Sequence, residues 1–248
     1  MTVLLVLLAA GCHRRVAPAP APRRLVRLEL PASLEPERQA YTSALEAARS
    51  HVVAWFDAQG LRLDDRELID AAVVFADVAD ARRRLAKHFS VTEDQIPDGF
   101  SGTVDGKTLF LVPRAAYERT WARLYPEHPW SSGAYQQLMA HELAHRAHAL
   151  EAVKRAGSEE GMGPRWFFEG LAITCAGQFA ERPLPSLARA PFEALVTSDA
   201  TQVLSYPLYG QMFTSVAERR PVRWLVEHAG RGDFAARLAA ALPPAPAP

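Results

Sequence analysis

Two histidines and a glutamate form the most chemically informative spacing in the chain. The segment His141-Glu142-Leu-Ala-His145 lies in a run of good helix formers and reads H-E-x-x-H. Because helical residues advance by about 100°, His141 and His145 share one face, one turn apart, and both imidazoles can bind one metal ion. Glu142 lies at the edge of that face, where it can reach a water on the metal without ligating the metal itself. The spacing predicts a metal centre with Glu142 as general base.

A second motif lies downstream, in the segment Pro164-Arg-Trp-Phe-Phe-Glu169-Gly-Leu-Ala172. Together, H-E-L-A-H and the pattern P-x-W-x-x-E-G-x-A resemble the gluzincin metallopeptidases, in particular the bacterial peptidase MA-like families. The resemblance implies that Glu169 is the third zinc ligand, beside His141 and His145, and that the fold is zincin-like. A His₂Glu set leaves the fourth position of Zn²⁺ to water, which is the arrangement of a catalytic zinc rather than a structural one.

Other metal patterns fit these letters less well. In the metzincin pattern H-E-x-x-H-x-x-G-x-x-H the glycine would fall at His148 and the third histidine at Glu151, and neither position fits. His148 lies close to the angular position of His141, so it could be a fourth ligand or could hydrogen-bond a ligand. We expect it instead to be a partly exposed histidine beyond the reach of the metal. Cys175 lies well round the helix from Glu169, and we expect a buried structural thiol there.

Peptide hydrolysis also requires a hydrogen-bond donor for the tetrahedral oxyanion. In gluzincins a tyrosine or histidine of the helical C-terminal half often supplies it, and Tyr206-Pro-Leu-Tyr209-Gly-Gln211 resembles the Tyr-x-Gln helix of the family. The resemblance makes Tyr209 the first candidate and Tyr206 the second. The alternative is that Tyr209 serves only the core. An extended peptide would bind along an edge of the small sheet, and the strand from Lys107 to Val112 is the candidate edge.

The remaining periodicity predicts an α+β domain with a small N-terminal β-sheet, an active-site helix and a helical C-terminal half. A helix runs over 36–59 and stops at Gly60. The apolar run 71–76 predicts a strand, and Asp77 is a suitable N-cap for a helix over 78–89. Asp105-Gly106 predicts a hairpin within 99–112. Further helices are predicted at 134–150, 165–179, 208–219, 222–229 and 234–242.

Both ends of the chain differ in composition from its middle. Residues 1–11 are apolar and lead into Leu8-Ala-Ala-Gly-Cys12, which resembles a bacterial lipoprotein signal that is cleaved before Cys12, whose thiol is then lipidated. A secretory signal that contains a cysteine by chance is the alternative. An extended Ala/Pro/Arg-rich tether is predicted over 12–31, a single metallopeptidase-like domain over 32–242 and a disordered Pro/Ala tail over 243–248. On this interpretation Cys175 is a lone thiol.

Composition excludes several classes of protein. Of 248 residues, 28 are Lys or Arg and 28 are Asp or Glu, so no net positive field favours binding to nucleic acid. Hydrophobic residues make up 49% of the chain, and two cysteines are too few for a disulfide framework. The composition is therefore that of an ordinary globular protein.

The sequence as a whole predicts a zinc-dependent peptidase, lipid-anchored in the bacterial cell envelope on its periplasmic or extracytoplasmic side, with Zn²⁺ as cofactor and a peptide or protein as substrate. An endopeptidase is favoured because the chain lacks the Gly-x-Met-Glu-Asn segment with which one aminopeptidase branch binds a free amine. The alternative is a zinc-binding or scaffolding lipoprotein of the same fold without turnover. A third hypothesis is that the histidines are structural and bind no metal.

Overall fold

A four-stranded mixed sheet forms the N-terminal part of the computed structural model, which describes residues 25–244. The strand order is β1 (Arg27–Glu29), β2 (Ala71–Val74), β4 (Thr108–Leu111), β3 (Gly102–Asp105). The first three strands run parallel, and β3 pairs antiparallel with β4 so that Gly102 faces Leu111. All four residues of β2 are buried, as expected for an uninterrupted run of Ala and Val between two parallel neighbours.

Local signals in the sequence account for the connections near the sheet. The side chain of Asp77 accepts a hydrogen bond from the backbone N–H of Asp80 and caps α3 (Val78–Phe89), as predicted. Gly106 adopts a φ of 54° in the turn between β3 and β4, so the predicted Asp105-Gly106 hairpin is confirmed. A short 3-10 helix, η2 (Glu93–Gln95), lies between α3 and this hairpin.

Two expectations about the sheet are wrong. The strand within 107–112 is β4, which lies inside the sheet between β2 and β3, so the free edge on that side is β3. Residues 27–29, assigned to the tether by composition, form the opposite edge strand β1 and pair with β2. A strand of three residues carries no periodicity of its own, and its pairing with residues 71–73 is a tertiary contact that composition does not reveal.

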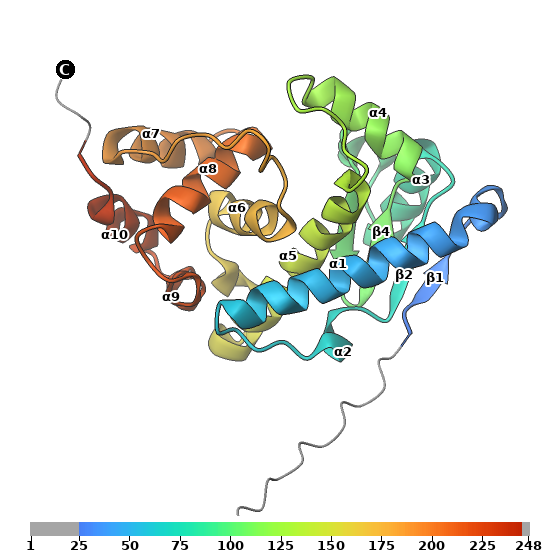
Figure 1. Ribbon diagram of the computed structural model, residues 1–248, viewed down its shortest axis with the longest axis horizontal. Coiled ribbons are helices and arrows are strands. Elements are labelled where there is room, and N and C mark those ends of the chain that lie inside the picture. The colour runs from blue at the N-terminus through green and yellow to red at the C-terminus, as the bar shows by residue number, and fades with distance from the viewer. Residues whose placement is uncertain (1–24, 245–248) are drawn as a thin grey trace, which may run out of the picture.

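The long helix α5 (Ala134–Ala156) crosses the molecule between the sheet and the C-terminal helices (Figure 1). The helix α1 (Arg38–Ala58) packs along it, after a 3-10 turn, η1 (Ala32–Glu37), and stops before Gly60, so the predicted helix over 36–59 is confirmed. Ala140, Ala144 and Ala147 are at most 2% exposed, and such small side chains allow close packing around α5. The helix continues to Ala156, beyond the predicted end, because Gly157 supplies its left-handed cap.

The C-terminal half is helical, as predicted. It contains η3 (Glu159–Met162), α6 (Arg165–Ala176), α7 (Arg189–Asp199), α8 (Tyr206–Ala217), α9 (Val222–His228) and α10 (Phe234–Ala241). The helix α6 stops at Ala176 because Gly177 turns left-handed with a φ of 68°. The prediction that the helix continues over 177–179 is therefore wrong. The helices α2 (Asp65–Leu68), α4 (Arg114–Leu124) and α7 are additional to the predicted ranges. Within 25–244, no helix is both long and apolar enough to span a membrane.

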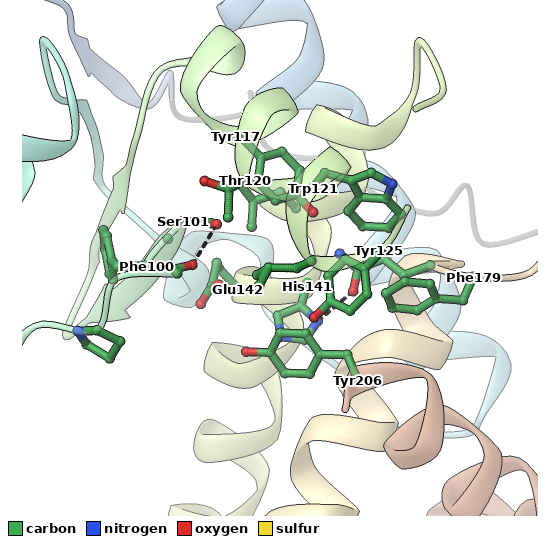
Figure 2. A pocket seen from close by; sticks show the side chains of 16 residues that line it. Phe100, Ser101, Tyr117, Thr120, Trp121, Tyr125, His141, Glu142, Phe179 and Tyr206 are labelled. Carbon is green, nitrogen blue, oxygen red and sulfur yellow. Dashed lines mark hydrogen bonds between the residues drawn. The ribbon is translucent and has the colours of Figure 1, made fainter. Parts of the chain in front are cut away.

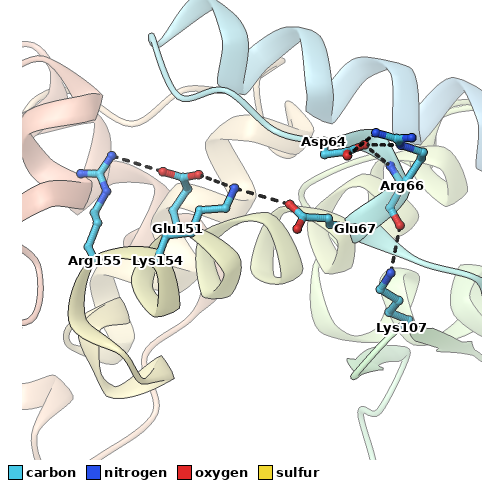
Figure 3. Close-up of polar contacts among 7 residues, drawn as sticks. All are labelled: Asp64, Arg66, Glu67, Lys107, Glu151, Lys154 and Arg155. Atoms are coloured by element: carbon cyan, nitrogen blue, oxygen red, sulfur yellow. Dashed lines mark hydrogen bonds and ion pairs between the residues drawn. The ribbon is translucent and has the colours of Figure 1, made fainter. Parts of the chain in front are cut away.

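Ion pairs hold the C-terminal turns of α5 in place (Figure 3). Glu151 is 6% exposed, and its carboxylate lies 3.2 Å from both Lys154 Nζ and Arg155 Nη2. Lys154 also lies 3.6 Å from Glu67 on α2, and Arg155 lies 3.2 Å from Glu227 on α9. Because a buried carboxylate is costly without partners, this network ties α5 to one helix of each half of the molecule.

Helices α6 and α8 approach each other closely at two glycines. A Cβ at Gly170 would overlap the carbonyl oxygen of Tyr209 and lie 2.6 Å from Cβ of Phe213. A Cβ at Gly210 on the facing helix would lie 3.0 Å from Cγ2 of Ile173. Gly170 therefore requires glycine because of this close approach, whereas a Cβ at Gly210 would be accommodated only if the side chain of Ile173 shifted slightly.

We predict that Gly170→Ala lowers the free energy of unfolding by about 1–3 kcal/mol, because the added methyl group overpacks the contact between α6 and α8. Urea unfolding followed by circular dichroism measures the change. Gly232→Ala is the matched control, because a Cβ at Gly232 meets no atom within 4 Å. Equal stability of the two variants would show that the helices are less tightly packed than described.

Candidate metal centre

Three side chains from two helices converge beside the sheet. His141 and His145 come from α5 and Glu169 comes from α6. The Nε2 atoms of the two histidines lie 3.0 Å apart. Oε2 of Glu169 lies 3.4 Å from Nε2 of His141 and 3.5 Å from Nε2 of His145. The structure therefore brings together the three residues that the two motifs single out, and this group could hold a metal ion.

The spacing and chemistry of these donors fit a small divalent cation. Nitrogen and oxygen ligands about 2.0–2.1 Å from a tetrahedrally coordinated ion lie about 3.4 Å from one another, close to the distances found here. Oε2 of Glu169 is buried and has no hydrogen-bond partner, which is costly for a carboxylate oxygen unless a cation lies nearby. Burial raises the pKa of Glu169, but His141 and His145 lower it by a larger amount. The net pKa is therefore far below its usual range, and the ligand is charged.

A hydrogen bond from outside the cluster orients the first histidine. Nδ1 of His141 lies 2.9 Å from Oε1 of Gln178, and an amide oxygen only accepts hydrogen bonds, so Nδ1 is the donor. The lone pair is then on Nε2, the nitrogen that faces the other two ligands. Gln178 comes from the turn that follows Gly177, and the sequence gives no signal for its role because the pattern over 165–179 predicts a helix there.

Glu142 lies next to the cluster and outside it. Its side chain is close to β3, since a Cβ at Gly102 would lie 3.1 Å from Cγ and 3.3 Å from Oε1 of Glu142. Burial raises the pKa of Glu142 to about 7, while His141 opposes this shift and Glu169 adds to it. The carboxyl group thus has the position of a base beside the metal ligands and can hold or release a proton near neutral pH.

The two candidate tyrosines have different positions. The ring of Tyr206 lies 5.6 Å from the ring of His141 and lines the same cavity as Glu142 (Figure 2). Desolvation and the nearby carboxylates of Glu169 and Glu142 raise the pKa of Tyr206, so its hydroxyl keeps its proton. Tyr209 is fully buried, and its hydroxyl donates to Asp199 Oδ1 at 2.8 Å. The structure thus places Tyr206 beside the cluster. Tyr209, the first candidate, instead uses its hydroxyl to bond Asp199.

Asp199 connects the helix that carries Glu169 to the helix that carries Tyr206. Its Oδ2 accepts from the backbone N–H of Trp166 at 3.1 Å, in the first turn of α6. Its Oδ1 accepts from Arg165 Nε at 2.9 Å and from the hydroxyl of Tyr209 on α8. Asp199 is 7% exposed, and this set of partners compensates for its burial. The role of Tyr209 is therefore to fix α8 against α6.

Two other residues considered from the sequence lie outside the cluster. The expectation that His148 is partly exposed is wrong, because its ring is fully buried beside Phe167 at a centroid distance of 5.5 Å. Burial lowers the pKa of His148 to about 3, with a smaller contribution from the charges of His145 and Arg155, so the ring is neutral. The expectation for Cys175 is confirmed: it is a free buried thiol, and burial raises its pKa.

A cleft of about 480 Å³ opens onto the cluster. It is lined by Gly102, Thr103 and Val104 of the edge strand β3, and also by Phe168, Glu159, Glu160, Met162 and Gly163. All three cluster residues, together with Glu142 and Tyr206, line this cleft. The candidate ligands, the candidate base and an unpaired strand edge therefore face one space that is accessible from solvent.

No family model, curated protein or solved structure matches the chain. The resemblance to gluzincins thus rests on the two motifs, and the interpretation of the site rests on the geometry described above.

We predict that Gln178→Ala weakens metal binding by about 10- to 100-fold, because His141 loses the hydrogen bond that orients its ring. Competition with a chromophoric zinc chelator measures the affinity. Gln39→Ala is the control, since its amide bonds Ser43 on the exposed face of α1. An unchanged affinity in Gln178→Ala would mean that this hydrogen bond does not orient the ligand.

Proposed function

We propose that the protein is a zinc-dependent peptidase that cleaves within peptide chains. The observation that carries this proposal is the triangle of His141, His145 and Glu169, with Glu142 beside it and an open strand edge along the same cleft. Two histidines and one carboxylate are the ligand set of catalytic zinc sites, which keep one position open. Zinc bound there would polarise the carbonyl of the substrate and lower the pKa of a water ligand towards about 7.

Glu142 is the general base in this proposal. It accepts a proton from the attacking water and returns it to the leaving amine, which requires a carboxyl group that changes its charge near neutral pH. The contact with Gly102 restricts where its side chain can move, because β3 lies against it. The base is therefore held between the metal ligands and the strand that would carry the substrate.

Tyr206 takes the role of oxyanion donor in place of Tyr209. Its protonated hydroxyl can donate a hydrogen bond, and its ring lies over the cleft beside His141. The hydroxyl of Tyr209 is already engaged with Asp199, so it has no proton free for the substrate.

The substrate is an extended peptide that adds to the free edge of β3. The backbone groups of an edge strand pair readily with another strand, and β3 is the strand that lines the cleft. We place the protein in the bacterial cell envelope on the basis of the lipoprotein-like segment ending at Cys12, which lies outside the described residues.

We predict that Glu142→Gln retains about one zinc per chain and lowers peptide hydrolysis by about 10²- to 10⁴-fold, the usual contribution of a general base. Metal analysis and mass spectrometry of a proteome-derived peptide library measure the two quantities. Glu118→Gln on the exposed face of α4 is the matched control. Undiminished hydrolysis by Glu142→Gln would refute this role. A wild-type protein that binds zinc but cleaves nothing would instead favour a scaffolding lipoprotein.

We predict that Tyr206→Phe mainly lowers the rate of catalysis, whereas Tyr209→Phe mainly lowers the stability of the fold. Tyr206→Phe should lower kcat by about 10²- to 10³-fold with little change in stability, because it removes an oxyanion donor. Tyr209→Phe should lower kcat far less than Tyr206→Phe does, because its hydroxyl only positions α8, and should lower the free energy of unfolding by about 1–3 kcal/mol, because Asp199 loses a buried partner. Steady-state kinetics and urea unfolding of both variants test this pair, and the reverse pattern would return the role to Tyr209.

A further inference from the structure

A second cavity adjoins the cleft, and many of its lining residues are aromatic (Figure 2). It has a volume of about 190 Å³, and we call it the aromatic pocket. Its ring-bearing lining residues are Phe100, Tyr117, Trp121, Tyr125, His141, Phe179 and Tyr206. No lysine or arginine is among the described residues that line it, and the one carboxylate among them belongs to Glu142. The pocket is thus suited to apolar groups and unsuited to acidic ones.

Ring contacts build one wall of the pocket. Trp121 and Phe179 stack with an interplanar angle of 12° and a centroid distance of 5.0 Å, and Tyr125 meets Phe179 edge-on at the same distance. The indole Nε1 of Trp121 donates to the carbonyl oxygen of His128 at 2.7 Å, so its polar atom is satisfied. Apolar ring surface is therefore available to a ligand in this wall.

The backbone at Phe179 is held in an unfavourable conformation. Its φ of 60° is in the left-handed region, and within 25–244 the only other such residue besides glycine is Ser90, which caps a helix. Such a conformation is costly for a bulky residue and often occurs at functional sites. Here the same turn directs Gln178 to His141 and the ring of Phe179 into the pocket wall. One turn thus determines both the orientation of His141 and the shape of the pocket wall.

The aromatic pocket opens next to the reacting groups. Four residues line both it and the metal cleft: Gly102, His141, Glu142 and Tyr206. A peptide paired with β3 at the metal centre therefore passes the mouth of the pocket. A cavity of about 150 Å³ lined by apolar residues is large enough to hold benzene, so a pocket of about 190 Å³ holds one aromatic or large aliphatic side chain.

We propose that the aromatic pocket binds one large apolar side chain of the substrate next to the bond that is cleaved, and so selects peptides with Phe, Tyr, Leu or Met at that position. This inference rests on the proposed peptidase function. Burial of such a side chain, compared with alanine, favours binding by about 10- to 100-fold. An aspartate is disfavoured, because it would lose its hydration among the aromatic rings of the pocket.

Binding and cleavage can be measured separately on one series of peptides. The series is Ac-Ala-Ala-X-Ala-Ala-NH₂ with X as Phe, Leu, Ala or Asp. Isothermal titration calorimetry with the zinc-loaded Glu142→Gln variant measures binding, and mass spectrometry with the zinc-loaded wild type measures cleavage. We expect the Phe and Leu peptides to exceed the Ala peptide by about 10-fold or more in affinity and the Asp peptide to bind least.

Two substitutions at Thr120, which lines the pocket from α4, test where the preference arises. Thr120→Trp fills the pocket and should bring the Phe-to-Ala ratio close to one. Thr120→Arg adds a positive charge and should favour the Asp peptide over the Ala peptide. Ala122→Trp, on the exposed side of the same helix, is the matched control and should keep the original ratio. The melting temperature of each variant shows that it is folded.

The outcomes separate this inference from the proposed function. Selective binding of the Phe and Leu peptides without any cleavage supports the pocket and overturns the peptidase. Cleavage with equal efficiency for all four peptides supports the peptidase and overturns the pocket. A selectivity that persists in both Thr120 variants, or the absence of binding by any peptide, also overturns the pocket.

Discussion

The contact between α5 and α6 is the constraint on which the rest of the site depends. His141 and His145 are one turn apart on α5, and the third ligand, the carboxylate of Glu169, must come from another helix at a distance of a few ångströms. Such a distance between the ligand atoms is maintained only if the two helices are tightly packed. Three features keep these helices tightly packed: the buried alanines of α5, the glycine contact between α6 and α8, and the ion pairs of Glu151.

The polar groups around the cluster act through position more than through charge. Asp199 fixes the start of α6 by accepting from the N–H of Trp166, and through Tyr209 it fixes α8 as well. Because Tyr206 begins α8, the same carboxylate determines where the candidate oxyanion donor lies relative to the ligand Glu169. A buried aspartate outside the site thus controls the relative position of two groups within it.

The sheet contributes an edge and a boundary. Since β4 pairs on both sides, only β3 offers unpaired backbone groups to the cleft, and its Gly102 leaves room for the side chain of Glu142. The turn after α6 carries Gln178, which bonds His141, and Phe179, which lines the aromatic pocket, at the price of a strained backbone. The close approach of Gly102 brings main chain next to the candidate base, which restricts access to it.

The sequence by itself determined the features that arise from local chemistry. The spacing of His141 and His145, the cap at Asp77, the Asp105-Gly106 turn and the helix stop at Gly60 all depend on residues a few positions apart, and each is found where predicted. The motif around Glu169 also named the third member of the cluster correctly. Local rules were sufficient in these cases because the interacting groups belong to one element or to a recognisable motif.

Only the tertiary structure decided which strand is the edge, which tyrosine faces the cluster and which side chain orients His141. Tyr206 and Tyr209 lie on the same helix, and their different roles follow from where α8 packs against Asp199 and His141. The strand β1 and the turn at Gln178 likewise depend on partners far away in the chain. Pairing and packing between distant segments carry no local signature, so a single sequence could not predict them.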